Sequence, residues 1–377
     1  MKTLSTVESY LQEHQEEILE DLHTLVAAES PSENKTLVDQ CGKTLQQLTE
    51  KLIGGEVNVF PQVERGNHFK VTIGEGENRV LICAHFDTVW EQGRLPIQVT
   101  DGKFYGPGAI DMKGGIVQSL WAVHALKEAD QLPDLELVFL FTSDEELGSQ
   151  TSRSLIEQEA KASDIVLITE PPVAKTGALK TARKGVGIYN LEVTGKSSHA
   201  GNHHSAGNSA ILELAQQIIK LENLTDYEVG TTVNVGVING GTKRNVVPDY
   251  AEALIDFRVE TEEEAERMVN ILENLEPITT DVEVDICGDL NRPPMVKTES
   301  TQQLYEKAQQ AGEEVGLQIK EEHAGGGSDG NFTAILGAPT LDGLGALGEG
   351  PHAEHEHIII DELPKRAAFL AHLMKKI

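Results

Sequence analysis

The fold is decided by residues 80–116, which read VLICAHFDTVW, then a polar linker, then YGPGAIDMKGGI. Residues 80–84 form a continuous apolar run rich in β-branched side chains, which predicts a strand buried on both faces. His85 and Asp87 follow directly at the end of this strand. Ligands of open α/β sheets bind just beyond the carboxyl ends of the strands. We therefore expect His85 and Asp87 to project into a cleft.

The polar residues after this strand are typical of a metal site. A neutral imidazole binds metal ions, and a nearby carboxylate orients it by accepting its other N–H. A Gly-Pro-Gly turn at 106–108 then brings Asp111 ahead of a helix that starts at Gly114. A capped strand end followed by a polar loop is the structural alternative, and this stretch alone leaves both interpretations open.

Length, charge and cysteine content limit the organisation and the partners. A chain of 377 residues is too long for one ordinary core, so two domains are expected. A net charge of −30 argues against nucleic acids and anionic membrane surfaces as partners, because both are polyanions. Three widely spaced cysteines fit a reducing compartment. The sequence has neither a signal-peptide core nor a run of about 18 apolar residues, so we predict a cytoplasmic protein.

The first part of the chain alternates between predicted strands and helices, which indicates an α/β sheet flanked by helices. Ser30-Pro31-Ser32 separates the first two helices and can cap the second. Glu145 and Glu146 follow one strand and Glu170 follows another, so the polar chemistry is expected at one edge of the sheet. Helices are predicted at 5–27, 35–53, 114–127 and 151–160, and strands at 57–60, 69–73, 80–84, 135–141 and 164–168.

The sequence changes character near residue 180, where a strand-helix-strand-strand-helix-strand pattern begins. This order predicts a ferredoxin-like α+β module inserted into the first domain. Thr261 can cap its second helix, with Glu264 completing a capping box. We predict a first domain in two parts, 1–179 and 291–377, around an inserted domain at 180–290. The inserted strands are expected at 189–194, 231–238, 250–258 and 280–287 and its helices at 209–221 and 261–273; helices at 301–315 and 361–375, a turn at 325–330 and a strand near 338–341 follow.

Hard oxygen and imidazole groups on separate loops suit a pair of Zn²⁺ ions. Two histidines and three carboxylates can hold ions about 3.5–4 Å apart, bridged by one carboxylate, and Asp111 is the natural bridge. One carboxylate is then left over to serve as the general base that a two-metal hydrolase needs. The candidates are His85, Asp111, Glu145, Glu146, Glu170 and His352.

Alternatives to this metal site remain open. Glu145 and Glu146 could divide the roles of ligand and base, since neighbours on an extended backbone point opposite ways. An Asp-Glu-Glu run is, however, more commonly a solvated turn. His352, His355 and His357 could all be surface histidines, and spacing alone does not decide which of them binds metal.

Seven motifs follow one another along the chain: AHFDTV, GPGAIDMKGG, SDEELGS, TEP, SSHAG, NVVPD and GGGSDG. In this order they resemble the M20 family of dinuclear zinc exopeptidases and amidohydrolases, and within it the glutamate carboxypeptidase branch. The resemblance implies two zinc sites that share Asp111, one completed by His85 and Glu170 and the other by Glu146 and His352. Co²⁺ and Mn²⁺ can use the same ligands.

The resemblance also implies roles around the metal ions. Glu145 would be the general base, and Asp87 would orient His85. The family often has a cis peptide after the bridging aspartate, here Asp111-Met112. Glutamate at position 170 resembles the carboxypeptidase and deacylase branches, because aminopeptidase-like relatives tend to carry aspartate there.

Polar residues of the inserted domain resemble substrate-binding positions. His199 in SSHAG would stabilise the oxyanion, from its own or a partner subunit. Asn245 and Arg258 would bind the free carboxylate of the substrate, for which a planar guanidinium is suited. Outside the inserted domain, in the second part of the first domain, Gly326 and Gly327 could offer backbone N–H groups to an anion. A loop histidine, a surface charge and a flexible turn are the corresponding structural alternatives.

The sequence thus predicts a zinc hydrolase that cleaves an amide bond beside a free carboxylate in a short peptide or an N-acyl amino acid. Water bridging the zinc ions would attack the carbonyl, Glu145 would move the proton, and the zinc ions and His199 would stabilise the oxyanion. A homodimer through the helix at 209–221 and an edge strand is expected. Acetylornithine deacetylase, succinyl-diaminopimelate desuccinylase, tripeptidase and an inactive metal-binding scaffold are the alternatives.

Overall fold

The computed structural model describes residues 6–377, which form two compact units. The first unit comprises the chain up to Ala182 together with Lys297–Ala324 and Ser328–Ile377. The second comprises Arg183–Val296 and Gly325–Gly327. The sequence places the boundaries after residues 179 and 290, whereas the compact units divide after Ala182 and Val296.

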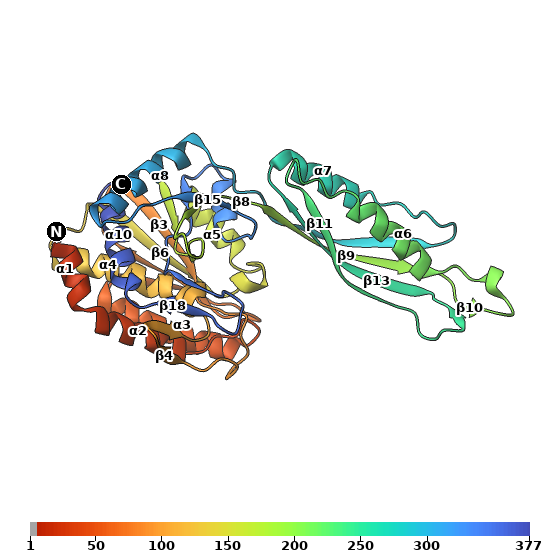
Figure 1. Ribbon diagram of the computed structural model, residues 1–377, viewed down its shortest axis with the longest axis horizontal. Helices are drawn as coiled ribbons and strands as arrows, with labels where there is room; N and C mark the ends of the chain where they lie inside the picture. The colour runs from red at the N-terminus through yellow and green to blue at the C-terminus, as the bar shows by residue number, and fades with distance from the viewer. Residues whose placement is uncertain (1–5) are drawn as a thin grey trace. The chain divides into compact units, whose positions relative to one another are not determined.

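The first unit is built on a mixed six-stranded sheet (Figure 1), with the predicted strand at 80–84 in its interior. Residues 80, 82 and 84 pack into the core on one face, and residues 81 and 83 pack into the core on the other. The run is apolar throughout because both faces are covered, which confirms the prediction. The sheet order is β1 (Glu56–Phe60), β2 (His68–Ile73), β6 (Leu135–Thr142), β3 (Asn78–His85), β7 (Ile165–Ile168) and β16 (Thr340–Leu341).

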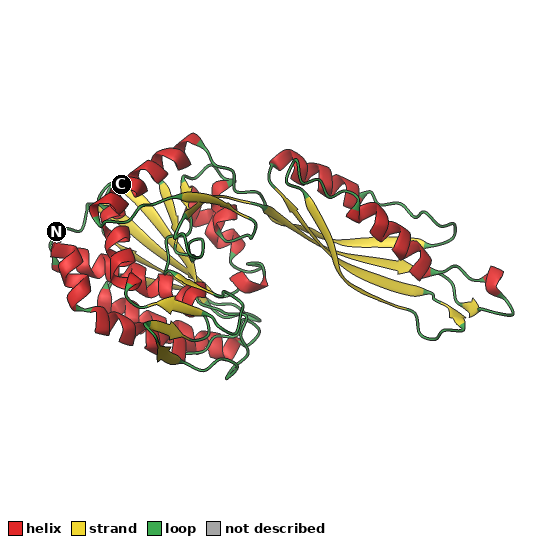
Figure 2. Cartoon of the chain, viewed as in Figure 1, coloured by secondary structure: helices red, strands yellow, loops and turns green. Residues whose placement is uncertain are grey.

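Helices cover both faces of this sheet, as Figure 2 shows. α4 (Gly114–Glu128), which begins just after Asp111, is buried almost along its whole length. The smaller core on the opposite face includes side chains of α5 (Arg153–Lys161) and α9 (Gly330–Ala334). The other helices are α1 (Thr6–Glu13), α2 (Gln15–Ala27), α3 (Lys35–Leu52), α8 (Glu299–Glu314) and α10 (Glu362–Met374).

Two predictions about the N-terminal helices are wrong. The helix predicted at 5–27 starts outside the described residues, and within them it is two helices that break at His14. The cap of α3 is Asn34, whose Oδ1 accepts the N–H of Leu37 at 3.2 Å. Ser30 and Ser32 instead donate their hydroxyls to the segment after β3. These two serines were misassigned because their partners lie more than fifty residues away in the sequence.

The second unit has the predicted strand-helix-strand-strand-helix-strand order. Its antiparallel sheet runs β11 (Thr232–Gly240), β13 (Tyr250–Val259), β9 (Gly185–Thr194) and β14 (Glu283–Arg292). Helices α6 (Ala210–Glu222) and α7 (Glu262–Glu273) share its core. Two central strands, β9 and β13, flanked by β14 and β11 give the strand arrangement of a ferredoxin-like module. β11 and β14 are therefore the edge strands.

The predicted capping box of α7 forms only in part. The Thr261 hydroxyl caps the helix by accepting the N–H of Glu264 at 3.2 Å. The Glu264 carboxylate accepts hydrogen bonds from the Thr231 hydroxyl at 2.5 Å and from Arg267 at 2.7 Å. These contacts replace the expected bond back to the Thr261 N–H, because a charged guanidinium is a stronger donor than a backbone amide.

The sequence did not reveal several short strands, one group of which flanks the segments carrying Asp111 and His352. β17 (Gly348–Glu349), β18 (His357–Ile359), β5 (Lys103–Tyr105) and β4 (Gln98–Thr100) form this sheet. They are too short to show a periodic pattern. The others are β8 (Leu179–Arg183) with β15 (Glu321–Ala324), and β10 (Ser198–His199) with β12 (Val246–Val247). None of the helices within residues 6–377 has the length and apolar character needed to cross a membrane.

Candidate metal centre

Three predicted ligands from separate segments meet at the carboxyl end of β3. His85 ends β3, Glu170 follows the parallel strand β7, and Asp111 lies in the irregular turn Ala109–Lys113 before α4. His85 Nε2 is 3.2 Å from Asp111 Oδ1 and 3.5 Å from Glu170 Oε1. Neighbouring parallel strands place their carboxyl ends at one edge, so residues 85 apart in the sequence become neighbours.

The second oxygen of Asp111 faces a second histidine. His352 Nε2 is 3.4 Å from Asp111 Oδ2 and 3.1 Å from Glu146 Oε2. The two oxygens of Asp111 therefore point to different imidazoles, which is the arrangement of a bridging carboxylate. The peptide bond between Asp111 and Met112 is cis.

The two other histidines of this segment have different surroundings. His357 is buried, its Nδ1 lies 2.7 Å from the carbonyl oxygen of His355, and its ring packs against Tyr105 with centroids 5.0 Å apart. His355 packs beside His357 and the backbone of Gly350. Of the three histidines that the sequence left as alternatives, His352 is therefore the one placed with the acidic cluster.

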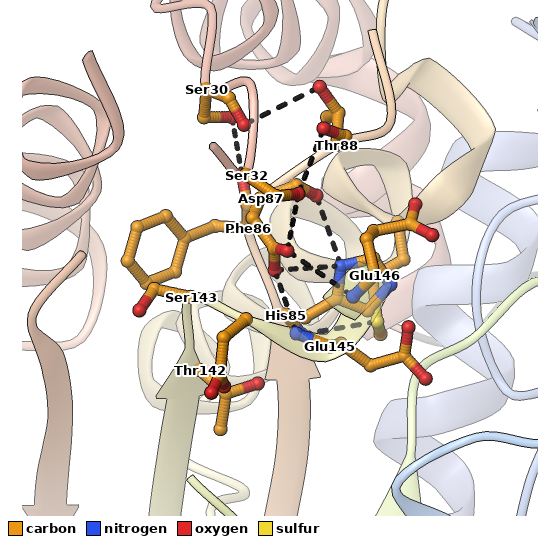
Figure 3. A network of polar contacts seen from close by, with 12 residues as sticks. Ser30, Ser32, His85, Phe86, Asp87, Thr88, Thr142, Ser143, Glu145 and Glu146 are labelled. Atoms are coloured by element: carbon orange, nitrogen blue, oxygen red, sulfur yellow. Dashed lines mark hydrogen bonds and ion pairs between the residues drawn. The ribbon is translucent and has the colours of Figure 1, made fainter. Parts of the chain in front are cut away.

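Glu145 and Glu146 lie in a 3-10 turn, Glu145–Leu147, and not in an extended segment as the sequence argument assumed. Their carboxylates nevertheless separate, as Figure 3 shows. Glu146 approaches His352, whereas a carboxylate oxygen of Glu145 lies within 4.8 Å of ligand atoms of His85 and Glu170. Glu145 thus lies beside the cluster, where it could act as a base or as a ligand.

Asp87 connects the glutamate turn to the segment that follows β3 (Figure 3). The sequence assigned the orientation of His85 to the Asp87 carboxylate, but the shorter contact of His85 Nδ1, 3.1 Å, is with the Asp87 backbone carbonyl. The carboxylate lies 3.5 Å away. It accepts the N–H groups of Glu145 and Glu146, both at 3.3 Å, and the hydroxyl of Ser32 at 2.7 Å. Asp87 therefore positions both glutamates as well as His85.

The pKa values of the cluster show that it attracts positive charge. Hydrogen bonds to Asp111 and Glu146 raise the pKa of His352 to about 11. Burial opposes charge on His85, yet contacts with Asp111, Asp87 and Glu170 raise its pKa well above the ordinary value. The same imidazoles outweigh the burial of Asp111 and lower its pKa. Burial raises the pKa of Glu146 to about 7, against the effect of His352. Protons on the two histidines balance carboxylates that a metal cation would otherwise balance.

The donor set fits divalent cations. Within the described residues, Glu146 Oε1 is a buried acceptor without a hydrogen-bond partner, and a bound cation would satisfy it. Imidazole nitrogens and carboxylate oxygens suit Zn²⁺, Co²⁺ and Mn²⁺. Two ligand groups, His85 with Asp111 and Glu146, and His85 with Glu145 and Glu170, have atoms within 4.8 Å of one another.

His199 of the second unit is held in one tautomer. Its Nδ1 accepts the backbone N–H groups of Gly201 at 3.1 Å and Asn202 at 3.0 Å. Because Nδ1 is an acceptor, the ring proton lies on Nε2 and can be donated to another group. The backbone carbonyl of Asn245 accepts the N–H of Ala200 at 3.1 Å, so the predicted residues His199 and Asn245 lie on neighbouring segments.

The other predicted substrate-binding groups of the second unit already have partners. Arg258 donates from Nε and Nη2 to the two oxygens of Asp256, each at 2.7 Å. The carbonyl oxygens of Gly326 and Gly327 accept the Nη1 group of the buried Arg183 at 2.9 and 3.2 Å. An incoming anion would therefore meet a Gly-rich turn whose carbonyl side is already bonded to a cation.

Sequence reasoning missed two residues that support the cluster. Ser32 gave no signal, because its contact with Asp87 joins segments 55 residues apart. Glu356 lies four residues after His352, and this nearness to a predicted ligand is the only feature of the sequence that could have indicated its supporting role. Burial raises the pKa of Glu356 to about 7, while the Trp90 N–H opposes that shift.

A mixed α/β sheet that gathers histidines and carboxylates at its carboxyl edge has the side chains that a metal-assisted hydrolase needs. Residues 81–376 match peptidase family M20/M25/M40, and the chain belongs to this family of metallopeptidases. It is 32% identical over 311 residues to carboxypeptidase G2 from Pseudomonas sp. (strain RS-16), covering 80% of this chain and 74% of that protein.

Two further relatives extend the comparison. Acetylornithine deacetylase from Myxococcus xanthus is 31% identical over 235 residues, covering 56% of this chain and 58% of that protein. The structure of a tripeptidase from Staphylococcus aureus has the same fold, with a TM-score of 0.76 and 22% identity over 96% of this chain and 98% of that chain. The family thus includes relatives with different named activities.

Proposed function

We propose that this hydrolase cleaves an amide bond next to a free carboxylate, in the C-terminal residue of a short peptide or in an N-acyl amino acid. The observation that carries the proposal is the 32% identity to carboxypeptidase G2 over 80% of the chain. The cluster around Asp111 supports it, because its side chains suit metal-assisted hydrolysis.

Two divalent cations, Zn²⁺ or alternatively Co²⁺ or Mn²⁺, fit this cluster. His85, Asp111 and Glu170 would hold one, and Asp111, Glu146 and His352 the other. When bound, such cations lower the pKa of water and polarise a carbonyl oxygen. Asp87 would keep His85 and the glutamate turn in place through the contacts described above.

Glu145 is the proposed general base. It is the remaining carboxylate beside the cluster, and Asp87 anchors its backbone N–H at 3.3 Å. Glu145 would accept a proton from the attacking water and return it to the nitrogen of the leaving amine. One group can do both because the first transfer leaves it protonated.

The second unit would supply groups that bind the substrate. The proton on His199 Nε2 suits donation to the oxygen that becomes negative in the transition state. Arg258 and Asn245 are proposed to bind the free carboxylate, and Gly326 and Gly327 to offer backbone N–H groups. Because Asp256 occupies the Nε and Nη2 edge of Arg258, a substrate carboxylate would bind the other edge or displace Asp256.

Hydrolysis of a substrate panel by the Zn²⁺- or Co²⁺-loaded protein tests this proposal. The panel contains acyl-glutamates, dipeptides, tripeptides, N-acetylornithine and N-succinyl-diaminopimelate. Each substrate is compared with an analogue in which a carboxamide replaces the free carboxylate. We expect release of C-terminal amino acids and at least a tenfold lower kcat/KM for the carboxamides, since an Arg–carboxylate pair is worth about 1.5–3 kcal/mol.

The other outcomes of the panel are equally informative. Turnover confined to acetyl or succinyl amines would assign a deacylase reaction, of the kind that acetylornithine deacetylase from Myxococcus xanthus is named for in the acetyl case. Equal turnover of acids and carboxamides would exclude carboxylate recognition. A metal-loaded protein that hydrolyses no member of the panel would be better explained as a metal-binding scaffold.

We also propose that the protein is a cytoplasmic homodimer that associates through the second unit. β11 is an edge strand, and edge strands pair readily with another chain. Exposed apolar side chains lie on β11 and on α6, and exposed apolar groups on neighbouring elements suit an interaction surface. They are Ile211, Leu212, Ile219, Val237 and Ile238, which are 45%, 55%, 63%, 46% and 62% exposed. The free thiols of Cys41, Cys83 and Cys287 fit a reducing compartment.

The double substitution Ile219→Asp with Ile238→Asp is expected to convert the dimer into a monomer. Burying unpaired carboxylates in an apolar interface costs several kcal/mol, so association should weaken by about 100-fold or more. Light scattering after size-exclusion chromatography measures the mass. Val63→Asp, at a 92% exposed position of the first unit, is the control and should stay dimeric. A monomeric wild-type protein at micromolar concentration would refute the proposal.

A further inference from the structure

The carboxylate of Glu356 is buried, with 1% of the residue exposed, and it accepts four N–H groups. Oε1 accepts the backbone N–H groups of Ile110 at 3.1 Å and Asp111 at 3.3 Å. Oε2 accepts the backbone N–H of Gly108 at 3.2 Å and the indole N–H of Trp90 at 2.6 Å. Both oxygens are therefore used, and one face of the turn at 108–111 is tied to a single side chain.

All four donors are neutral N–H groups, so these contacts give the Glu356 carboxylate no opposite charge. Burying such a carboxylate is costly, and only its acceptor bonds offset the cost. A glutamine could not take its place, because its amide has one acceptor oxygen and an NH₂ group that would face N–H donors. The geometry therefore suits a side chain with two acceptor oxygens at this position.

Glu356 joins three segments that carry candidate metal ligands. Trp90 lies five residues after His85, which ends β3, and the turn at 108–111 carries Asp111. His352 lies four residues before Glu356 on the same segment. A shift of Glu356 would thus move Asp111 relative to His352, and these two side chains are 3.4 Å apart at their closest polar atoms.

We infer that Glu356 is a positioning residue for the metal centre, which holds the turn at 108–111 so that the two oxygens of Asp111 face His85 and His352. This inference rests on the proposed metal centre. Glu356 contacts backbone N–H groups and the Trp90 side chain, so it acts through Asp111. Outer groups that orient metal ligands typically contribute 10–100-fold to metal affinity.

The test is the Zn²⁺ affinity of the 377-residue chain, measured by competition with a chromophoric chelator. The wild type is expected to bind two equivalents of Zn²⁺, and Glu356→Gln is expected to bind at least one of them about 10–100-fold more weakly. Glu354→Gln is the matched control, two residues away on the same segment. The Glu354 side chain is 70% exposed and pairs with Arg94, so this variant should bind both equivalents as the wild type does. Circular dichroism and the Co²⁺ absorption spectrum report the fold and the ligand geometry.

The outcomes separate this inference from the proposed function. A wild-type protein that does not bind two equivalents would refute the metal centre itself. The wild type could bind two equivalents of Zn²⁺ while folded Glu356→Gln keeps the same affinity and the same Co²⁺ spectrum. That result would overturn the positioning role alone. Should Glu356→Gln fail to fold, Glu356→Asp decides. It keeps the charge but withdraws the carboxylate by one methylene, so wild-type affinity in that variant would overturn the inference.

Discussion

Glu145→Gln is expected to lower kcat by about 10²–10⁴-fold, the usual contribution of a general base. Glutamine keeps the size of the side chain and cannot accept the proton of the attacking water. The Glu145 N–H should still reach Asp87, because the substitution leaves the backbone unchanged. We therefore expect two bound cations and a little-changed KM. Steady-state kinetics on the best substrate of the panel, together with metal analysis of the same sample, measures both quantities.

The neighbouring glutamate is the natural comparison for this prediction. Glu146 contacts His352 at 3.1 Å, so Glu146→Gln should lose cation affinity as well as activity. The structure also places Glu145 within 4.8 Å of ligand atoms of His85 and Glu170. Loss of a cation from Glu145→Gln would therefore show that Glu145 is a ligand, and the assignment as base would be wrong.

Asp111→Asn is expected to weaken the binding of both cations and to lower kcat/KM by about 10³-fold or more. An amide has one oxygen that can bind a cation and no net charge, so it cannot face both His85 and His352 as a bridging carboxylate does. Metal ions contribute several kcal/mol to transition-state stabilisation, and roughly 4 kcal/mol corresponds to about 10³ in rate. Isothermal titration with Zn²⁺ or Co²⁺ gives the number and affinity of the sites.

Two other variants are compared with Asp111→Asn, one that removes no candidate ligand and one that removes a candidate ligand of a single cation. Asp101→Asn changes an exposed aspartate in the turn between β4 and β5, where φ is 50°, a value that asparagine tolerates, so affinity and activity should be unchanged. Glu170→Gln should affect mainly one cation, because Glu170 contacts His85 and belongs to one of the two groups. Full binding of two cations by Asp111→Asn would exclude Asp111 as the shared ligand.

The sequence by itself determined the main elements and the residues that meet at the sheet edge. The apolar run at 80–84 predicts a buried strand, and polar residues that follow parallel strands converge at one edge. His85, Asp111, Glu170 and the Glu145-Glu146 pair were therefore predictable at one edge, whereas the choice of Glu146 as the ligand and of His352 among three histidines came from the resemblance to the family. The ferredoxin-like order of the second unit was predictable for the same reason, since its strands and helices have clear periodicities.

Only the tertiary structure decided how these residues are held. Ser32 binds Asp87 across 55 positions of sequence, and Glu356 accepts the N–H of Asp111 across 245 positions. Such contacts leave no periodic signal, because they depend on where loops meet in space. The local arguments also failed where another partner competed. The segment after β3 binds the serines assigned to the cap of α3, and Thr231 and Arg267 bind the carboxylate of Glu264 in α7. Secondary structure follows from patterns along the chain, whereas the orientation of each ligand follows from hydrogen bonds between segments that only the folded chain brings together.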